Sequence, residues 1–292
     1  MDPWLTNHIK ELMFRPCLQI SGHIGQRLDN RRRMDETIDE RALTEDFVDH
    51  FDSSSSMSAW NGIAKRLQEN QIYLNTSVKK STREHHTGAD IGLAITRAIN
   101  HPNTRSNSRY AVLIQCKRVD HEGVVQDFHH EVKSSGRRQA SLMLDITPSS
   151  FYLIFTPPSL LKTYCTIEPL AFASPSRDCS TPVWNMGCFG FDSPSLPFLS
   201  ARQKAEATGV LVVPALAVEA QQESKGKAAI INDILPNALP LWYWFGELLL
   251  PGFIGDHSKK AVSVAKNEVD PDLSSNREFG VRYSVDFGFG NG

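Results

Sequence analysis

Two apolar stretches decide the fold: GADIGLAIT at residues 88–96 and YAVLIQCKRV at residues 110–119. In the first stretch apolar residues alternate from Ala89 to Ile95, as they do in a strand with one buried face. The second stretch is almost continuously apolar at its start, which is typical of a central strand. We therefore expect two neighbouring strands within one sheet.

Polar side chains stand at the facing ends of these two predicted strands. Asp90 opens the first strand, and Gln115 and Lys117 close the second. Because residues i and i+2 share one face of a strand, Gln115 and Lys117 point the same way and Cys116 points into the opposite layer. If the strands pair antiparallel, the start of one lies beside the end of the other. This arrangement predicts that Asp90 lies next to Gln115 and Lys117.

The flanking sequence predicts an α/β fold with a mixed central sheet and helices on its faces. Further strands are expected at residues 72–78, 151–156 and 209–218, and helices at residues 35–51, 58–70 and about 124–145, with polar loops at 79–87 and 97–109. The apolar block at 239–254 is shorter than the ~20 apolar residues of a membrane span. We expect it to form a buried helix and a turn, with no membrane contact.

Four segments are expected along the chain. Residues 1–34 form an N-terminal helical arm that ends in the basic run RLDNRRR, and residues 35–158 form the core. Residues 159–256 form an α/β C-terminal elaboration that packs on the core, and residues 257–292 form a polar, Gly-rich tail. The elaboration could supply a dimer surface, a DNA clamp or simply the rest of the core, and the sequence leaves these alternatives open.

Composition limits the class of protein. The 292 residues are 40% hydrophobic and 22% charged, which excludes a mainly disordered chain. The net charge of −2 excludes a global basic field, but residues 72–118 carry eight lysines and arginines against two acids, as phosphate binding would require. Five scattered cysteines without a CxxC pair argue against a disulfide framework or a zinc ribbon, so a reducing cytoplasm is the expected location.

Other catalytic motifs are absent from the sequence. It contains neither a P-loop nor a GxSxG motif, and its paired histidines, His85-His86 and His129-His130, do not complete HExxH. We interpret these histidines as loop or surface residues.

The pattern Asp90…Gln115-Cys116-Lys117 resembles the PD-(D/E)xK nuclease superfamily, whose core places an acidic residue on one strand and Glu/Gln-x-Lys on the next. The glutamine is similar to that of the Mrr-type restriction endonucleases. GAD followed by IQCKR is also similar to bacterial proteins with a GAD…QAKR core, many of them associated with defence against phage. The resemblance covers about residues 35–156 and implies a restriction-endonuclease-like fold.

The resemblance implies a Mg²⁺-dependent endonuclease acting on DNA, with Mn²⁺ as a substitute ion. Asp90, Gln115 and the Cys116 carbonyl would hold the metal, and Lys117 would serve the attacking water. The family often takes a further carboxylate from an early helix, and Glu40 is the candidate because it falls in the middle of that helix's apolar face. A frayed helix start, with Glu40 simply reaching water, is the alternative.

The candidate nucleic-acid contacts come from the basic segment and from the helix that follows the Gln-x-Lys strand. They are Lys79, Lys80, Arg83, Arg118, Arg138 and Gln139.

A second hypothesis is a catalytically inactive nuclease-fold subunit that binds DNA or regulates a defence complex, because Gln115 brings one charge fewer than a glutamate. RNA as the substrate, a partner subunit and a homo-oligomer are also left open, since contacts to phosphates and metal do not distinguish DNA from RNA.

Overall fold

The structure is a computed structural model of the chain. It describes residues 7–51, 59–81, 84–101, 104–164, 209–220, 228–250, 252 and 254–266. The elements of the first half are α1 (Asn7–Arg33), α2 (Glu40–Phe51), α3 (Asn61–Glu69), β1 (Ile72–Lys80), α4 (Glu84–Thr87), β2 (Ile91–His101), β3 (Thr104–Arg118), β4 (Val124–Val125), β5 (Glu131–Val132), β6 (Arg137–Arg138), α5 (Gln139–Ile146), β7 (Ser150–Phe155) and α6 (Pro158–Tyr164). Those of the second half are β8 (Val210–Pro214), α8 (Ala215–Ala220), β9 (Ala229–Ile230), α9 (Ile231–Ile234), η4 (Leu235–Asn237), β10 (Leu239–Pro240), α10 (Leu241–Tyr243), the π-helix η5 (Trp244–Leu249) and α11 (Lys259–Lys266).

A six-stranded mixed sheet organises the described part of the chain, with the strand order β1-β2-β3-β7-β8-β10. Strands β1, β2 and β3 form a long antiparallel meander, and β7 then lies parallel to β3. Strands β8 and β10 continue the sheet in antiparallel fashion. The expected α/β class with a mixed central sheet is therefore confirmed.

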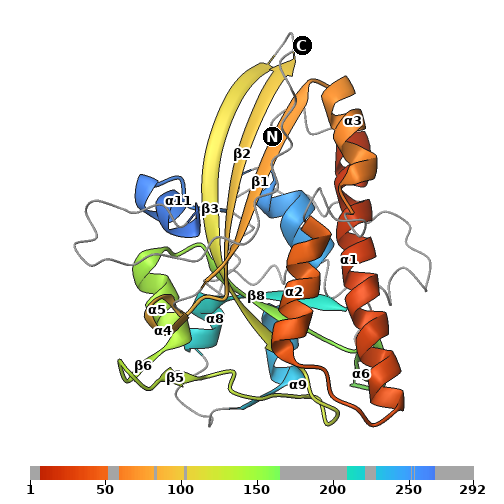
Figure 1. The fold of residues 1–292 in the computed structure, drawn as a ribbon, viewed down its shortest axis with the longest axis vertical. Coiled ribbons are helices and arrows are strands. Elements are labelled where there is room, and N and C mark those ends of the chain that lie inside the picture. Colours follow the sequence, from red (N-terminus) through yellow and green to blue (C-terminus); the bar gives the residue numbers. More distant parts are fainter. Residues whose placement is uncertain are drawn as a thin grey trace.

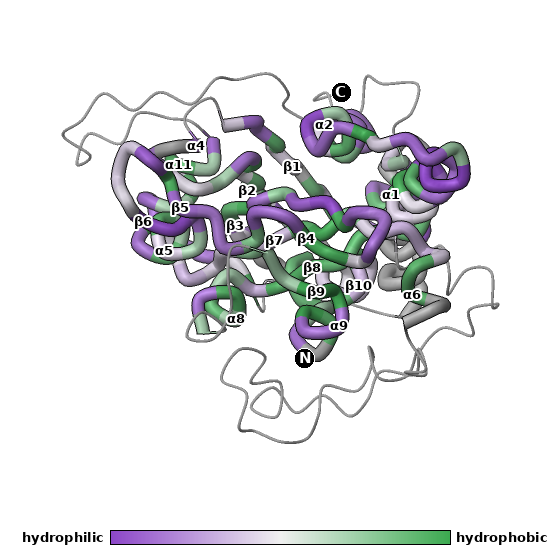
Figure 2. Tube along the Cα trace, turned by 90° about the horizontal axis from the view of Figure 1, so that it is seen from below, coloured by the Kyte–Doolittle hydropathy of each residue, from purple (hydrophilic) through white to green (hydrophobic). Residues whose placement is uncertain are grey.

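Helices cover both faces of this sheet. Figure 1 shows α1, α2 and α3 on one side of the long strands, and α4, α5, α8 and α11 on the other. The tube in Figure 2 gives the same arrangement from below, with hydrophobic segments concentrated in the strands between the two helical layers. Alternation along β3 divides the core accordingly, because Ile114 and Cys116 belong to the cluster beneath α1 and α2, whereas Leu113 belongs to the cluster beneath α5 and α8.

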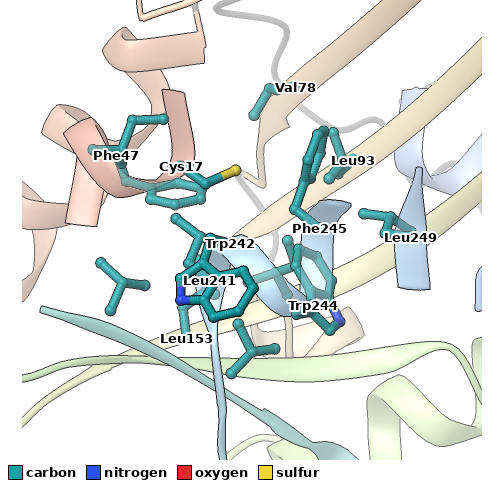
Figure 3. Close-up of a cluster of buried hydrophobic side chains, with 14 of the residues drawn as sticks. Cys17, Phe47, Val78, Leu93, Leu153, Leu241, Trp242, Trp244, Phe245 and Leu249 are labelled. Carbon is teal, nitrogen blue, oxygen red and sulfur yellow. The ribbon is translucent and has the colours of Figure 1, made fainter. Parts of the chain in front are cut away.

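The core beneath α1 and α2 is rich in aromatic side chains. In Figure 3, Cys17 of α1 and Phe47 of α2 gather with Trp242, Trp244 and Phe245 from the apolar block. This block is buried, as the sequence predicts, although it forms a short strand, one helical turn and a π-helix. Helix α1 is not a free arm, because one of its faces is part of this core. No helix among the described residues is long and apolar enough to cross a membrane.

The helix expected at about 124–145 is wrong over most of its length. Residues 124–138 instead form the short strands β4, β5 and β6, and α5 begins only at Gln139. Two residues with positive φ, Asp127 at 50° and Gly136 at 62°, lie in turns within the segment, and a helix cannot pass through this conformation.

Two other segments differ from expectation. The predicted loop at 97–109 is largely strand, because β2 and β3 pair as far as His101 and Thr104. Helix α2 begins at Glu40 rather than at residue 35, since Asp35 has a φ of 56°.

The C-terminal half completes the core. Strands β8 and β10 belong to the central sheet itself, and α11, within the segment expected to be a tail, packs on β2 and β3 through buried Ala261, Val262 and Ala265. Residues 165–208, 221–227, 251, 253 and 267–292, which hold the rest of the predicted elaboration and tail, lie outside the described residues.

The contact between α11 and β2 depends on Gly92. A β-carbon at this position would lie 2.5 Å from the main-chain oxygen of Ala265. We expect Gly92→Ala to lower the free energy of unfolding by ~1–3 kcal/mol, because the helix backbone must move away. Urea denaturation measures this, with the exposed-surface variant Lys260→Ala as a control that should stay within about 0.5 kcal/mol of wild type. A Gly92→Ala protein as stable as wild type would contradict the docking of α11.

Candidate functional site

The candidate site lies where β2 begins and β3 ends. Ile91 pairs with Ile114 in the antiparallel register, and the main-chain N–H of Asp90 donates to the Ile114 carbonyl at 2.9 Å. Asp90 and Gln115 therefore stand side by side, one residue beyond the last apolar pair. This is the juxtaposition that the sequence predicts, and it results from antiparallel pairing together with the period of two along each strand.

The Asp90 carboxylate is held from β3 by two hydrogen bonds. Its Oδ2 accepts from Nε2 of Gln115 at 2.7 Å and from the main-chain N–H of Cys116 at 2.8 Å. The Gln115 amide also donates to the Cys116 carbonyl at 3.2 Å. The Cys116 side chain is fully buried in the opposite layer, as expected.

Lys117 is nearly buried, and a carboxylate accompanies it. Its Nζ lies 3.9 Å from Oε1 of Glu40, and the two side chains are 6% and 36% exposed. A buried ammonium group requires such compensation. Glu40 stands in the first turn of α2, where the carboxylate also accepts the main-chain N–H of Arg118. Glu40 thus does not simply reach water, although it does begin the helix.

Gly88, the first residue of the GAD motif, allows α5 to approach this site. Its φ is 69°, and a β-carbon here would lie 2.3 Å from the main-chain oxygen of Gln139. Both the left-handed backbone and the close approach require glycine. The motif thus packs the start of α5 against the turn that leads to Asp90.

A cavity of about 980 Å³ opens beside Asp90. Its described lining comes from the start of α2, the end of β1, α4, the β5–β6 hairpin and the start of α5: Glu40, Arg41, Thr44, Glu45, Lys80, Ser81, Glu84, Asp90, His130, Val132, Lys133, Ser134 and Gln139. The lining carries four acids, three basic side chains and one histidine. Gln115 and Lys117 are not among these described lining residues, so Asp90 is the part of the strand cluster that the cavity reaches.

Glu84 is a site residue that the sequence reasoning missed. It opens the short helix α4, six residues before Asp90, and its Oε1 accepts a hydrogen bond from Nε2 of Gln139. Gln139 itself is only 2% exposed. The spacing to the GAD motif was visible in the sequence, but nothing there showed that α4 would turn Glu84 towards α5.

Crowding of carboxylates perturbs the site. Burial and then repulsion from Glu84 raise the pKa of Asp90 from 3.8 to about 8, while the Cys116 N–H and Lys117 oppose the rise. Burial likewise raises the pKa of Glu40, and Lys117 opposes it. Negative charge is therefore costly here, and a cation would relieve it.

The predicted nucleic-acid contacts are only partly placed around the cavity. Lys80 lines it but forms an ion pair with Glu45 at 2.7 Å. Gln139 also lines it. Lys79, Arg118 and Arg138 are half-buried. Lys79 lies on β1, Arg118 at the end of β3 and Arg138 just before α5. Arg83 lies outside the described residues.

Part of the positive charge of residues 72–118 lies away from the site. Arg97 is 4% exposed and donates to the Leu250 carbonyl at 2.9 Å and to Ser108 at 3.0 Å. It lies seven strand residues from Asp90, or roughly 23 Å at ~3.3 Å per residue. The excess of lysine and arginine over residues 72–118 is therefore weaker support for phosphate binding.

The histidines also differ from expectation. His129 is buried, at 6% exposure, and burial lowers its pKa. His130 lines the cavity from the residue before β5.

The donor atoms suit a hard cation in chemical type. The amide oxygens of Gln115 and Gln139 are both buried without a hydrogen-bond partner, which is unfavourable unless another group satisfies them. Carboxylate and amide oxygens are the ligands of Mg²⁺. No group of three or more His, Cys, Asp or Glu suited to a metal occurs among the described residues, so a cation here would need these amide oxygens besides the acids.

The chain matches no protein-family profile, and it shows no significant similarity to curated proteins or to solved structures.

The raised pKa of Asp90 predicts a pH-dependent stability. Between about pH 4 and pH 8 the folded state retains a proton that the unfolded state has lost, so this group's contribution to the free energy of unfolding falls as pH rises. We expect Asp90→Asn to be more stable than wild type at pH 8 in EDTA, with a smaller difference at pH 5. Urea denaturation at both pH values measures this. Equal pH dependence in the two proteins would show that Asp90 is not under electrostatic strain.

Proposed function

We propose that this protein is a Mg²⁺-dependent endonuclease that hydrolyses phosphodiester bonds of DNA, on a restriction-endonuclease-like core. The observation that carries the proposal is the Asp90–Gln115 hydrogen bond. It supports a compact Asp…Gln-x-Lys cluster across two antiparallel strands, at the edge of a large cavity. A role in bacterial antiviral defence, with or without a partner subunit, belongs to the proposal through the sequence resemblance.

Each residue of the cluster would have a separate role in hydrolysis. Asp90, with the oxygens of Gln115 and Cys116, would hold the cation. A bound Mg²⁺ or Mn²⁺ polarises the phosphoryl group and lowers the pKa of water. Lys117 would orient the attacking water and offset the charge that develops on the phosphoryl oxygens. Glu40 is 3.9 Å from the Lys117 ammonium and keeps that group in place.

Three basic side chains of the cavity lining would contact the phosphates of a nucleic acid. Arg41, Lys80 and Lys133 lie along its lining, on α2, β1 and the β5–β6 hairpin. Such contacts position a backbone without reading its sequence. They do not favour DNA over RNA, so both nucleic acids belong in the assay.

A second candidate function is a non-catalytic nucleic-acid-binding or regulatory subunit. The observation that favours it is the orientation of Gln115, whose amide nitrogen donates to Asp90. This hydrogen bond stabilises the carboxylate in the way that a cation would. A chain that had lost catalysis could keep its fold by this substitution of an amide for a metal ion.

Loss of either central group is expected to abolish cleavage. Asp90→Ala removes the carboxylate of the cluster, and Lys117→Ala removes the charge beside the reacting phosphate, so each should lower the rate at least about 100-fold. Supercoiled plasmid and single-stranded RNA, incubated with and without Mg²⁺, measure the rates. Lys260→Ala, on the exposed surface of α11, is the matched control for loss of a lysine, and circular dichroism checks folding. Cleavage at the wild-type rate by either variant would refute the assignment.

The substitution Gln115→Glu separates the two candidate functions. In the nuclease it adds an anionic ligand beside Asp90, so Mn²⁺ should raise the melting temperature of the variant more than that of wild type. In EDTA the variant should melt lower, because two buried carboxylates repel each other. If Mn²⁺ shifts the melting temperature of neither protein, the non-catalytic subunit is favoured.

A further inference from the structure

Three carboxylates approach the end of β3, and their partners differ. Glu40 lies 3.9 Å from Lys117. Glu84 lies instead on the side of α5, where it accepts a hydrogen bond from Gln139. Glu84 and Asp90 line the same cavity, and Gly88, two residues before Asp90, packs against the main chain of Gln139. Glu84 and Asp90 are therefore brought together at the start of α5, whereas Glu40 is engaged with Lys117.

Two buried amides that hold these carboxylates have oxygens without a hydrogen-bond partner. Gln139 is 2% exposed and lines the cavity, and its Oε1 has no hydrogen-bond partner. Gln115 is fully buried beside Asp90, and its Oε1 is likewise unpartnered. Each amide uses its nitrogen to hold a carboxylate, Glu84 and Asp90 respectively. On both amides the unsatisfied group is the acceptor oxygen, and beside two carboxylates a divalent cation is a suitable ligand for it.

We propose that Glu84 and Asp90, with the amide oxygens of Gln139 and Gln115, form the divalent-cation site, and that Glu40 is a positioning residue for Lys117. The inference rests on the proposed function for the identity of the ligand as Mg²⁺ or Mn²⁺. It replaces the assignment of Glu40 as a metal ligand, because Glu40 already compensates a nearly buried ammonium group. Gly88 makes this site possible by letting the start of α5 reach the GAD turn.

Mn²⁺ binding to the full chain tests the proposal without reference to cleavage. Isothermal titration calorimetry and electron paramagnetic resonance report the affinity for the ion itself. Glu84→Gln should weaken Mn²⁺ binding about tenfold or more, the size of effect seen when metal-site groups are removed. Glu45→Gln is the matched control, because Glu45 lines the same cavity, is 47% exposed and is paired with Lys80. It should change the affinity far less.

Two further variants keep the test decisive. Gln139→Met removes the amide oxygen while keeping an unbranched side chain of similar length, and it should weaken Mn²⁺ binding even if Glu84→Gln does not fold. Glu40→Gln should leave Mn²⁺ affinity close to that of wild type and reduce cleavage instead. The reverse pattern, with affinity lost in Glu40→Gln and retained in Glu84→Gln, would overturn the inference.

The result separates this inference from the proposed function. If wild type binds Mn²⁺ and Glu84→Gln loses it, the site stands even where no nucleic acid is cut. If Glu84→Gln and Glu45→Gln behave alike, or wild type binds no Mn²⁺ at millimolar concentration, the site assignment is wrong whatever the plasmid assay shows.

Discussion

The main constraint on this fold is a carboxylate that lies just beyond the last apolar pair of two central strands. Asp90 is held there by Gln115 and by the Cys116 N–H. Removing a charge from water costs several kcal/mol unless hydrogen bonds or an opposite charge replace the lost hydration. The surrounding segments supply that replacement, and the raised pKa of Asp90 shows that they do so incompletely.

The rest of the architecture brings groups to this point. Antiparallel pairing sets Asp90 beside Gln115, α2 brings Glu40 to Lys117, and the left-handed turn at Gly88 lets α5 bring Gln139. The two faces of the sheet contribute unequally. The face beneath α1 and α2 is aromatic and tightly filled, while the cavity opens between the start of α2 and the start of α5. The unpartnered oxygen of Gln139, in a cavity lined by more acids than bases, favours a cation as the first ligand, ahead of phosphate.

Some predictions succeeded because they rested on short-range geometry. The two-residue period of GADIGLAIT and YAVLIQCKRV, together with the assumed antiparallel pairing, placed Asp90 next to Gln115. The helix expected over about 124–145 is wrong as far as residue 138, because that part forms short strands and turns, with positive φ at Asp127 and Gly136. The charge count over 72–118 misled because a sum along the chain ignores distance, and Arg97 is an interior hydrogen-bond donor far from the site.

The alternation of apolar and polar residues along the chain therefore predicted the two strands, the α/β class and the polar residues at the strand ends. Alternation depends only on residues that are neighbours in the sequence. The choice between Glu40 and Glu84 needed the folded chain. Glu40 and Lys117 are 77 positions apart, and Glu84 and Gln139 are 55 apart. Such contacts depend on how helices pack on a sheet and on which side of its end each one arrives, and no periodicity along the chain encodes that.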